Sequence, residues 1–172
     1  TNREILFMFR KMILRWFSPA KRETNEFIRA LISGDIESMN AYMNKVTLKT
    51  ISYFDTGNTP SDEEPERFFH GFVLGLMVDQ TENYIINSNR ESGYGRYDIM
   101  LVPHDQKNNA IVMEFKVHEA DEEETLEDTV QAALKQIREK NYDAGLTAAG
   151  IPKEKIRHYG FAFEGKKVLI GK

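Results

Sequence analysis

The sequence predicts an α/β domain in which a mixed central sheet is flanked by helices and preceded by an N-terminal helical part. Three short strand-like segments follow one another between residues 83 and 117. An amphipathic helical segment comes next, and two further strand-like segments end the sequence. With 172 residues, of which 41% are hydrophobic, the chain is long enough to form one domain with its own core.

The first fifty residues carry helical patterns. Residues 3–17 have a basic polar side and an apolar stripe made of Ile5, Met8, Phe9, Met12, Ile13 and Trp16. We expect this helix to pack onto its own domain or onto upstream sequence, although a basic amphipathic helix can also lie on a membrane surface. Residues 25–35 and 35–46 predict a helical pair that is broken at Gly34, with Asp35 able to cap the second helix.

A third helix is expected just before the strand-like segments. Residues 50–64 are rich in turn-forming residues, and Ser61 followed by Glu64 is a capping-box pattern. The helix should run to about Asp79, because its apolar face continues through Phe69, Val73, Leu76 and Met77. Glu66 lies near its start.

The predicted strands are residues 83–89, 96–102 and 110–117. Residues 103–109 separate the last two, and this polar, turn-rich connection suits an antiparallel hairpin. Residues 125–142 then form a strong helical pattern with Thr125 as its cap. Residues 155–163 and 166–172 flank a short turn and predict a terminal hairpin.

The formal net charge of −4 hides a concentrated block of acid. Residues 119–128 hold seven acidic side chains and no basic one. Of the 27 acidic residues, 20 therefore remain elsewhere against 23 basic ones, so the rest of the chain carries +3. We interpret the block as a solvated loop leading into a helix, because like charges repel one another. The remainder is compatible with binding to nucleic acid.

Composition also limits the location and chemistry of the protein. The absence of cysteine excludes disulfides, thiolate catalysis and zinc sites built on sulfur, and it is compatible with a reducing cytoplasm. No apolar run is long enough to cross a membrane, since Arg10, Lys11 and Arg15 interrupt the first one. Because the chain starts at Thr1 rather than at a methionine, we expect it to be part of a longer protein with an upstream domain.

The strand over residues 110–117 places two charges in an apolar run. Glu114 and Lys116 share one face of this strand, because side chains alternate between faces. If residues 103–109 close the hairpin, Leu101 pairs with Ile111, and Asp98 falls opposite Glu114 with Cβ atoms about 5 Å apart. Two carboxylates beside a lysine are then expected.

A divalent cation would explain this arrangement. Unpaired, two neighbouring acids repel and one takes up a proton, whereas Mg²⁺ is bound by one or two carboxylates together with waters and phosphate oxygens. A lysine near the cation can orient a water or neutralise charge on a phosphate, which suits phosphodiester hydrolysis. The alternative is a plain salt bridge between Glu114 and Lys116 on an exposed sheet, since a Glu-x-Lys pattern is common by chance.

The residues Tyr97-Asp98 and "EFK" at 114–116 resemble the motif of the PD-(D/E)xK, or restriction-endonuclease-like, nuclease superfamily. The longer texts "ERFFHGFVLGLM", "SNRESGYGRYDIML" and "EFKV…ALKQIREKNY" are similar to the nuclease-like C-terminal domain of bacterial proteins whose N-terminal half resembles an AAA-ATPase. Tyr97 stands where the motif's name has proline. The resemblance implies a restriction-endonuclease-like core over residues 51–172, with residues 1–50 as a helical part packed on it.

The resemblance also implies roles for individual residues. Asp98, Glu114 and Glu66 would bind Mg²⁺ or Mn²⁺, and Lys116 would be the catalytic lysine. Gln136 would complete the site as the helix glutamine of some members. The spacing to Tyr142 departs from the better-known glutamine and tyrosine pattern.

Substrate contacts are expected around this core. Arg90 and Arg96 lie in a Gly-containing loop that enters the strand bearing Asp98, so both are candidates for contacting phosphate, and Tyr142 is a further candidate for substrate binding. The implied protein is a cytoplasmic, metal-dependent nuclease acting on DNA, and the implied partner is an upstream AAA-ATPase-like domain.

A non-catalytic module of the same fold, binding nucleic acid or a partner protein, remains the alternative. The sequence holds no Gly-x-Ser-x-Gly, P-loop or Gly-x-Gly-x-x-Gly motif, so serine hydrolysis, NTP binding and hydride transfer have no support.

Overall fold

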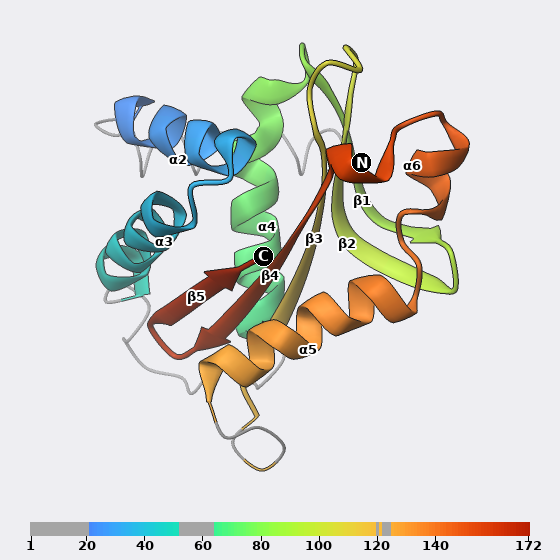
Figure 1. Ribbon diagram of the computed structural model, residues 1–172. Coiled ribbons are helices and arrows are strands. Elements are labelled where there is room, and N and C mark those ends of the chain that lie inside the picture. Colours follow the sequence, from blue (N-terminus) through green and yellow to red (C-terminus); the bar gives the residue numbers. More distant parts are fainter. Residues whose placement is uncertain (1–20, 52–63, 120, 122–124) are drawn as a thin grey trace, which may run out of the picture.

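The computed structural model describes residues 21–51, 64–119, 121 and 125–172 (Figure 1). Its strands are β1 (Tyr84–Ser92), β2 (Gly95–Pro103), β3 (Ala110–Val117), β4 (Ile156–Glu164) and β5 (Lys167–Gly171). They form one sheet in the order β1-β2-β3-β4-β5. The β3–β4 pair is parallel and the other neighbouring pairs are antiparallel. The predicted α/β fold with a mixed sheet is therefore confirmed.

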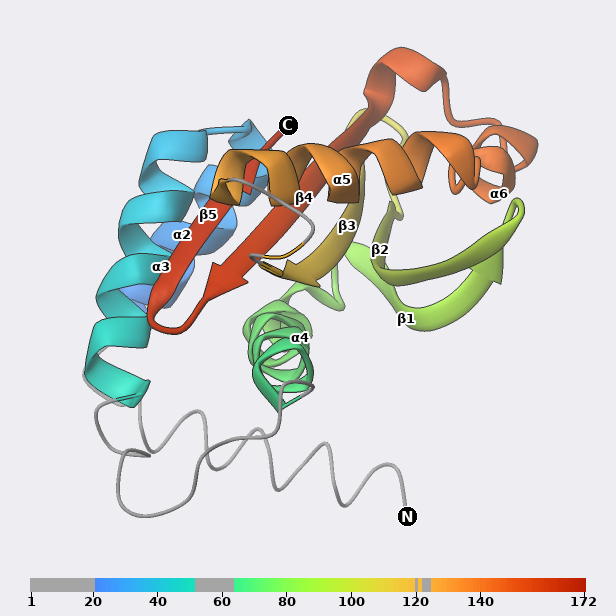
Figure 2. The same ribbon diagram turned by 90° about the horizontal axis from the view of Figure 1, so that it is seen from below.

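Helices cover both faces of this sheet. They are α2 (Lys21–Ser33), α3 (Ile36–Ile51), α4 (Glu64–Met77), α5 (Leu126–Glu139) and α6 (Ala144–Ala148), with short 3-10 turns at Val78–Gln80 and Lys153–Lys155. Figure 2 shows α4 on one face of the sheet and α5 on the other. Within the residues described, no helix is both long enough and apolar enough to span a membrane.

Strand β3 contributes to both apolar cores. Its side chains alternate, so Ile111, Met113 and Phe115 pack toward α2, α3 and α4, while Ala110 and Val112 pack toward α5. Helix α5 connects β3 to β4, which explains why these two strands run parallel, since a parallel pair needs a crossover connection. The core between the sheet and helices α2, α3 and α4 also contains the apolar face predicted for α4, namely Phe69, Val73, Leu76 and Met77.

The edge strand β5 is covered by side chains of α3. The amide of Asn44 donates to the Val168 carbonyl at 2.7 Å and accepts from the Val168 N–H at 3.0 Å. Asn40 makes the same two bonds to Ile170, at 2.9 and 2.8 Å. These amides take the place of a sixth strand, so the polar backbone edge of the sheet is satisfied. The N-terminal helices are thereby joined to the sheet.

The helical pair follows the prediction. The backbone at Gly34 has φ +83°, which ends α2, and the Asp35 carboxylate accepts from the Ser38 N–H at 3.1 Å at the start of α3. Helix α4 ends at Met77, two residues before the predicted Asp79. The helix predicted over residues 3–17 and the capping residue Ser61 lie outside the described residues.

The connection between the first two strands is shorter than the sequence suggested. Residues 90–95 read as part of a loop, but β1 extends to Ser92 and β2 begins at Gly95, and these two residues pair with each other. A two-residue turn remains. Gly93 makes it possible, because its φ of +60° is suited to the first central position of a tight hairpin turn.

Candidate active site

The paired part of β2 and β3 ends just before the two candidate carboxylates. Leu101 pairs with Ile111, as the loop length predicted, and the last pair is Ile99 with Met113. On the other side of β2, the pairing with β1 is interrupted at Asn89, which has φ +52°. Figure 2 shows that β1 and β2 both curve strongly. Asp98 and Glu114 therefore lie where the regular sheet stops.

The Asp98 side chain makes a hydrogen bond to β3 just beyond the last backbone pair of β2 and β3. Its Oδ2 accepts a hydrogen bond from the backbone N–H of Phe115 at 2.8 Å. Burial raises the pKa of the Asp98 carboxyl above its ordinary value, whereas the Phe115 N–H and the positive charge of Lys116 act to lower it. Because burial is the largest cause, the ionised form of this carboxyl is less favoured than that of an exposed aspartate.

Glu114 lies on the face of β3 that α5 covers, and only 4% of it is exposed. Its register partner on β4 is Gly160, and a Cβ at that position would come within 2.7 Å of the Val130 carbonyl oxygen. The glycine lets α5 approach the sheet closely. In that position the Gln136 side-chain amide donates a hydrogen bond to Glu114 Oε1. The Gln136 amide therefore helps to orient the Glu114 carboxylate.

Tyr142 connects this carboxylate to β2. The Gln136 amide lies 3.2 Å from the Tyr142 hydroxyl, which donates to the Arg96 carbonyl at 2.7 Å. Burial raises the pKa of the Tyr142 hydroxyl, and the charges of Glu114 and Asp98 raise it further. The phenol therefore remains a neutral donor. Because only 1% of Tyr142 is exposed, it positions its neighbours rather than presenting a surface.

Lys116 is half-buried at the end of β3. Its charge is close enough to lower the pKa of Asp98. In the described part of the chain, the Lys116 ammonium makes no hydrogen bond and no ion pair. The salt bridge with Glu114 that the sequence left open is accordingly not among its contacts, and the amine is available to other groups.

The remaining predicted residues lie around this group. Glu66 is in the first turn of α4, but its side chain lies outside the described residues. Arg90 on β1 and Arg96 on β2 are exposed. Arg90 pairs with Tyr97 in the sheet, so both arginines come from the β1–β2 hairpin just before Asp98.

The carboxylates that could hold a metal are Asp98 and Glu114. No group of three or more His, Asp or Glu side chains in metal-binding positions occurs among the residues described, to which the Glu66 side chain does not belong. Two hard oxygen donors from adjacent strands still fit Mg²⁺, which binds one or two carboxylates and completes its shell with water and phosphate oxygens. A cation bound beside Asp98 would offset the effect of burial on the pKa of its carboxyl.

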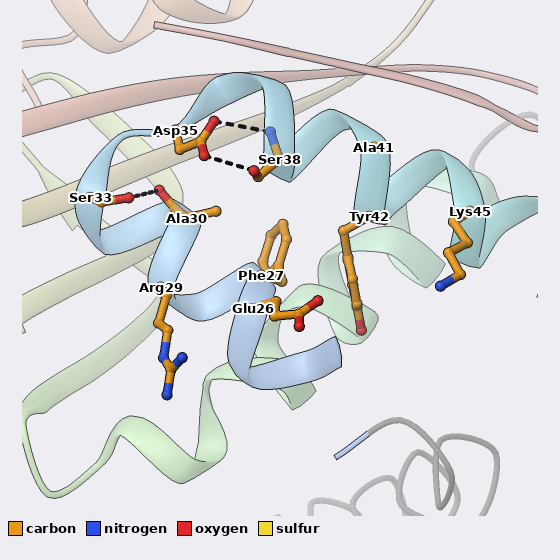
Figure 3. A pocket seen from close by; sticks show the side chains of 10 residues that line it. All are labelled: Glu26, Phe27, Arg29, Ala30, Ser33, Asp35, Ser38, Ala41, Tyr42 and Lys45. Atoms are coloured by element: carbon orange, nitrogen blue, oxygen red, sulfur yellow. Dashed lines mark hydrogen bonds between the residues drawn. The ribbon is translucent and has the colours of Figure 1, made fainter. Parts of the chain in front are cut away.

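A cavity elsewhere in the fold does not share this chemistry. It has a volume of about 510 Å³ and lies between α2 and α3 (Figure 3). Two acidic and two basic side chains, Glu26, Asp35, Arg29 and Lys45, surround an apolar floor that includes Phe27. The Asp35 carboxylate is occupied by Ser38. We therefore assign the site by its carboxylates and lysine, not by cavity size.

One contributor had no signal in the sequence. The backbone N–H of Phe115 donates to the Asp98 carboxylate, and because every residue except proline has such an N–H, the amino-acid sequence does not reveal this role. Its role follows only from the place where the β2–β3 ladder ends.

Residues 64–172 match the family model of the PD-(D/E)XK nuclease superfamily, which is more than half of the chain. The match spans α4, the whole sheet and α5, and thus contains every residue of the candidate site. No curated protein and no solved structure matches the chain. The chain belongs to the PD-(D/E)XK nuclease superfamily.

Proposed function

We propose that the protein is a Mg²⁺- or Mn²⁺-dependent nuclease that hydrolyses phosphodiester bonds of DNA. The observation that supports this most strongly is the fixed placement of Asp98 beside β3, where its carboxylate binds the N–H of Phe115, the residue between Glu114 and Lys116. This bond supports a site in which two carboxylates act beside a lysine whose amine makes no hydrogen bond or ion pair in the described part of the chain. The chain's membership of a nuclease superfamily supports the same chemistry.

Each side chain has a distinct part in this proposal. Asp98 and Glu114 hold the cation, and Glu66 completes the site from α4. Gln136 fixes the orientation of the Glu114 carboxylate by occupying Oε1. Lys116 places its ammonium where it stabilises negative charge as it develops on the phosphate, an effect that is larger in a site shielded from water. A bound Mg²⁺ would supply an activated water and neutralise phosphate oxygens.

The exposed Arg90 and Arg96 contact the phosphates of the DNA backbone on either side of the scissile bond. The finer resemblance, to nuclease-like C-terminal domains of bacterial AAA-ATPase-like proteins, supports an upstream AAA-ATPase-like domain as partner and a cytoplasmic location.

Metal-dependent cleavage tests the proposal. Plasmid nicking and degradation of labelled single strands would be measured with Mn²⁺ for wild type, Lys116→Ala, Glu114→Gln and the control Lys153→Ala, all purified identically. Lys116→Ala should lower cleavage by about 100-fold or more while leaving metal affinity largely intact, because the amine acts mainly in the transition state. Glu114→Gln should lose both cleavage and metal binding. Lys153→Ala, on the exposed 3-10 turn, should keep cleavage and metal binding.

Equal cleavage by all four proteins would identify a contaminating nuclease. The non-catalytic alternative makes a different prediction, namely metal and DNA binding by wild type without any product. That outcome on several substrates would replace the nuclease proposal.

A further inference from the structure

The turn between β1 and β2 presents an aromatic ring to solvent. Tyr94 is 80% exposed, more than Leu48 at 60% or Ile85 at 50%, the other large hydrophobic side chains exposed in the described part of the chain. A tyrosine ring at the tip of a hairpin is accessible to a partner, and its flat apolar face with a polar edge suits an interface.

The backbone beneath this ring is firmly held. The Tyr94 N–H donates to the Lys140 carbonyl at 2.7 Å, and the Ser92 hydroxyl donates to the Tyr142 carbonyl at 2.7 Å. A Cβ at Gly93 would lie 2.2 Å from the carbonyl oxygens of both Lys140 and Asn141, so the turn rests directly on the end of α5. A ring carried by an ordered backbone loses little further freedom when it binds a partner.

Three basic residues lie near this turn, Arg90 and Arg96 on opposite faces of the hairpin and Lys140 beneath it. Arg90, Arg96 and Lys140 are all exposed, and within the described residues their side chains form no hydrogen bond and no ion pair. Glu91, the acidic residue nearest the turn, pairs with Arg96 across the hairpin. An aromatic ring with these cations nearby suits a partner that offers flat π-faces and negative charge together. A single-stranded nucleic acid has both, whereas the bases of a duplex are already stacked.

The turn is also connected to the candidate site. Tyr94 lies in the turn directly before β2 and precedes Asp98 by four residues, a separation of at most about 13 Å at the rise of a β-strand. Between Tyr94 and Asp98, the Arg96 carbonyl accepts a hydrogen bond from the Tyr142 hydroxyl. That hydroxyl contacts the Gln136 amide, which donates to Glu114. A strand of nucleic acid lying in the site would therefore pass near the turn.

We propose that Tyr94 is a stacking platform for an unpaired base, with Arg90, Arg96 and Lys140 holding the neighbouring phosphates. The substrate class is then nucleic acid with single-stranded character near the cleavage point, an inference that rests on the proposed nuclease function.

Binding without metal separates this inference from catalysis. Anisotropy of a labelled single strand and of the duplex of the same sequence would be titrated in EDTA with wild type, Tyr94→Ala, Tyr94→Phe and Ile85→Ala. Tyr94→Ala should bind the single strand about fivefold or more weakly, since one base–aromatic stack is lost, while duplex affinity should change much less. Tyr94→Phe keeps the ring and should bind like wild type. Ile85→Ala removes another exposed apolar group of β1 and should have no effect.

A second measurement uses the Tyr94→Trp variant. A stacked base should quench the added indole when the single strand is titrated, beyond any change that wild type shows through Trp16, its only tryptophan. No loss of affinity in Tyr94→Ala, an equal loss for single strand and duplex, or no extra quenching would overturn the platform and leave the nuclease proposal standing. If wild type binds neither nucleic acid at any salt concentration, the platform is overturned, and the nuclease proposal is decided separately by the cleavage assay with Mn²⁺.

Discussion

The Asp98 carboxylate on β2 accepts a hydrogen bond from the Phe115 N–H on β3 at 2.8 Å, one step beyond the last regular pair of the two strands. A side chain thus replaces a backbone acceptor. The bond fixes the carboxylate against the residue that follows Glu114. Burial of Asp98 raises the pKa of its carboxyl, while this hydrogen bond and the charge of Lys116 act to lower it.

The first prediction concerns metal binding. Mn²⁺ should raise the free energy of unfolding of wild type, by about 2.7 kcal/mol when the free metal is 100 times the dissociation constant. Asp98→Asn keeps an acceptor for the Phe115 N–H but removes the charge, so it should show little of this increase. Thermal unfolding with and without Mn²⁺ measures the effect. The matched control is Glu154→Gln, which removes an exposed acid from a distant 3-10 turn and should respond like wild type.

The second prediction is a pH dependence of the metal-free protein. Because the native pKa of Asp98 is raised, the native state holds this proton more strongly than the unfolded chain does. The resulting stability is fully present below the unfolded pKa of about 3.9 and is lost as pH rises through the native pKa. Relative to Asp98→Asn, wild type should therefore become progressively less stable over this interval and then differ by a constant amount.

Urea denaturation of both proteins in EDTA across this pH range provides the measurement. Taking the difference between the two proteins cancels the titration of the other carboxylates. A difference that does not change with pH would show that Asp98 titrates alike in the native and unfolded states.

The third prediction concerns the support of Glu114. Tyr142→Phe removes the hydroxyl that donates to the Arg96 carbonyl and contacts Gln136, and should lower the free energy of unfolding by about 1 kcal/mol. Gln136→Leu removes a donor to a carboxylate and should cost about 1.5–3 kcal/mol. The double variant should cost less than the sum, because the two side chains contact each other. Strict additivity in chemical denaturation would mean that the two residues act independently.

The sheet was predictable because its signals are local. The loop over residues 103–109 fixes the pairing of Leu101 with Ile111, and the alternation of β3 fixes which face carries Glu114 and Lys116. Gln136 was identified by resemblance alone, since helical spacing does not say which face of α5 meets a carboxylate.

Other features depend on contacts that the sequence pattern does not encode. The end of the β2–β3 ladder coincides with Asn89 at φ +52°. Asparagine tolerates this conformation, but an asparagine in the sequence does not predict it. Helix α6 has only five residues, too few for a periodic pattern. The spacing of Asn40 and Asn44 is visible in the sequence, yet their partners on β5 lie 130 and 124 residues away.

The last prediction tests how firmly the Tyr94 turn is held, with a glycine pair as its own control. Gly93 and Gly165 both have positive φ, +60° and +54°, and both occupy hairpin turns. Replacing either with alanine strains the backbone by about 1–2 kcal/mol. At Gly165 nothing lies within 4 Å of the new Cβ, whereas at Gly93 the Cβ would lie 2.2 Å from two carbonyl oxygens.

Gly165→Ala should therefore lower the free energy of unfolding by the backbone strain alone, and Gly93→Ala by about 1–3 kcal/mol more, because the turn must move off the end of α5. Urea denaturation with equal slopes for both variants measures the difference. Single-strand binding should then fall in Gly93→Ala and persist in Gly165→Ala, because only the first displaces Tyr94. Equal losses of stability would mean that the hairpin shifts at no cost, and that Tyr94 has no rigid base on the end of α5.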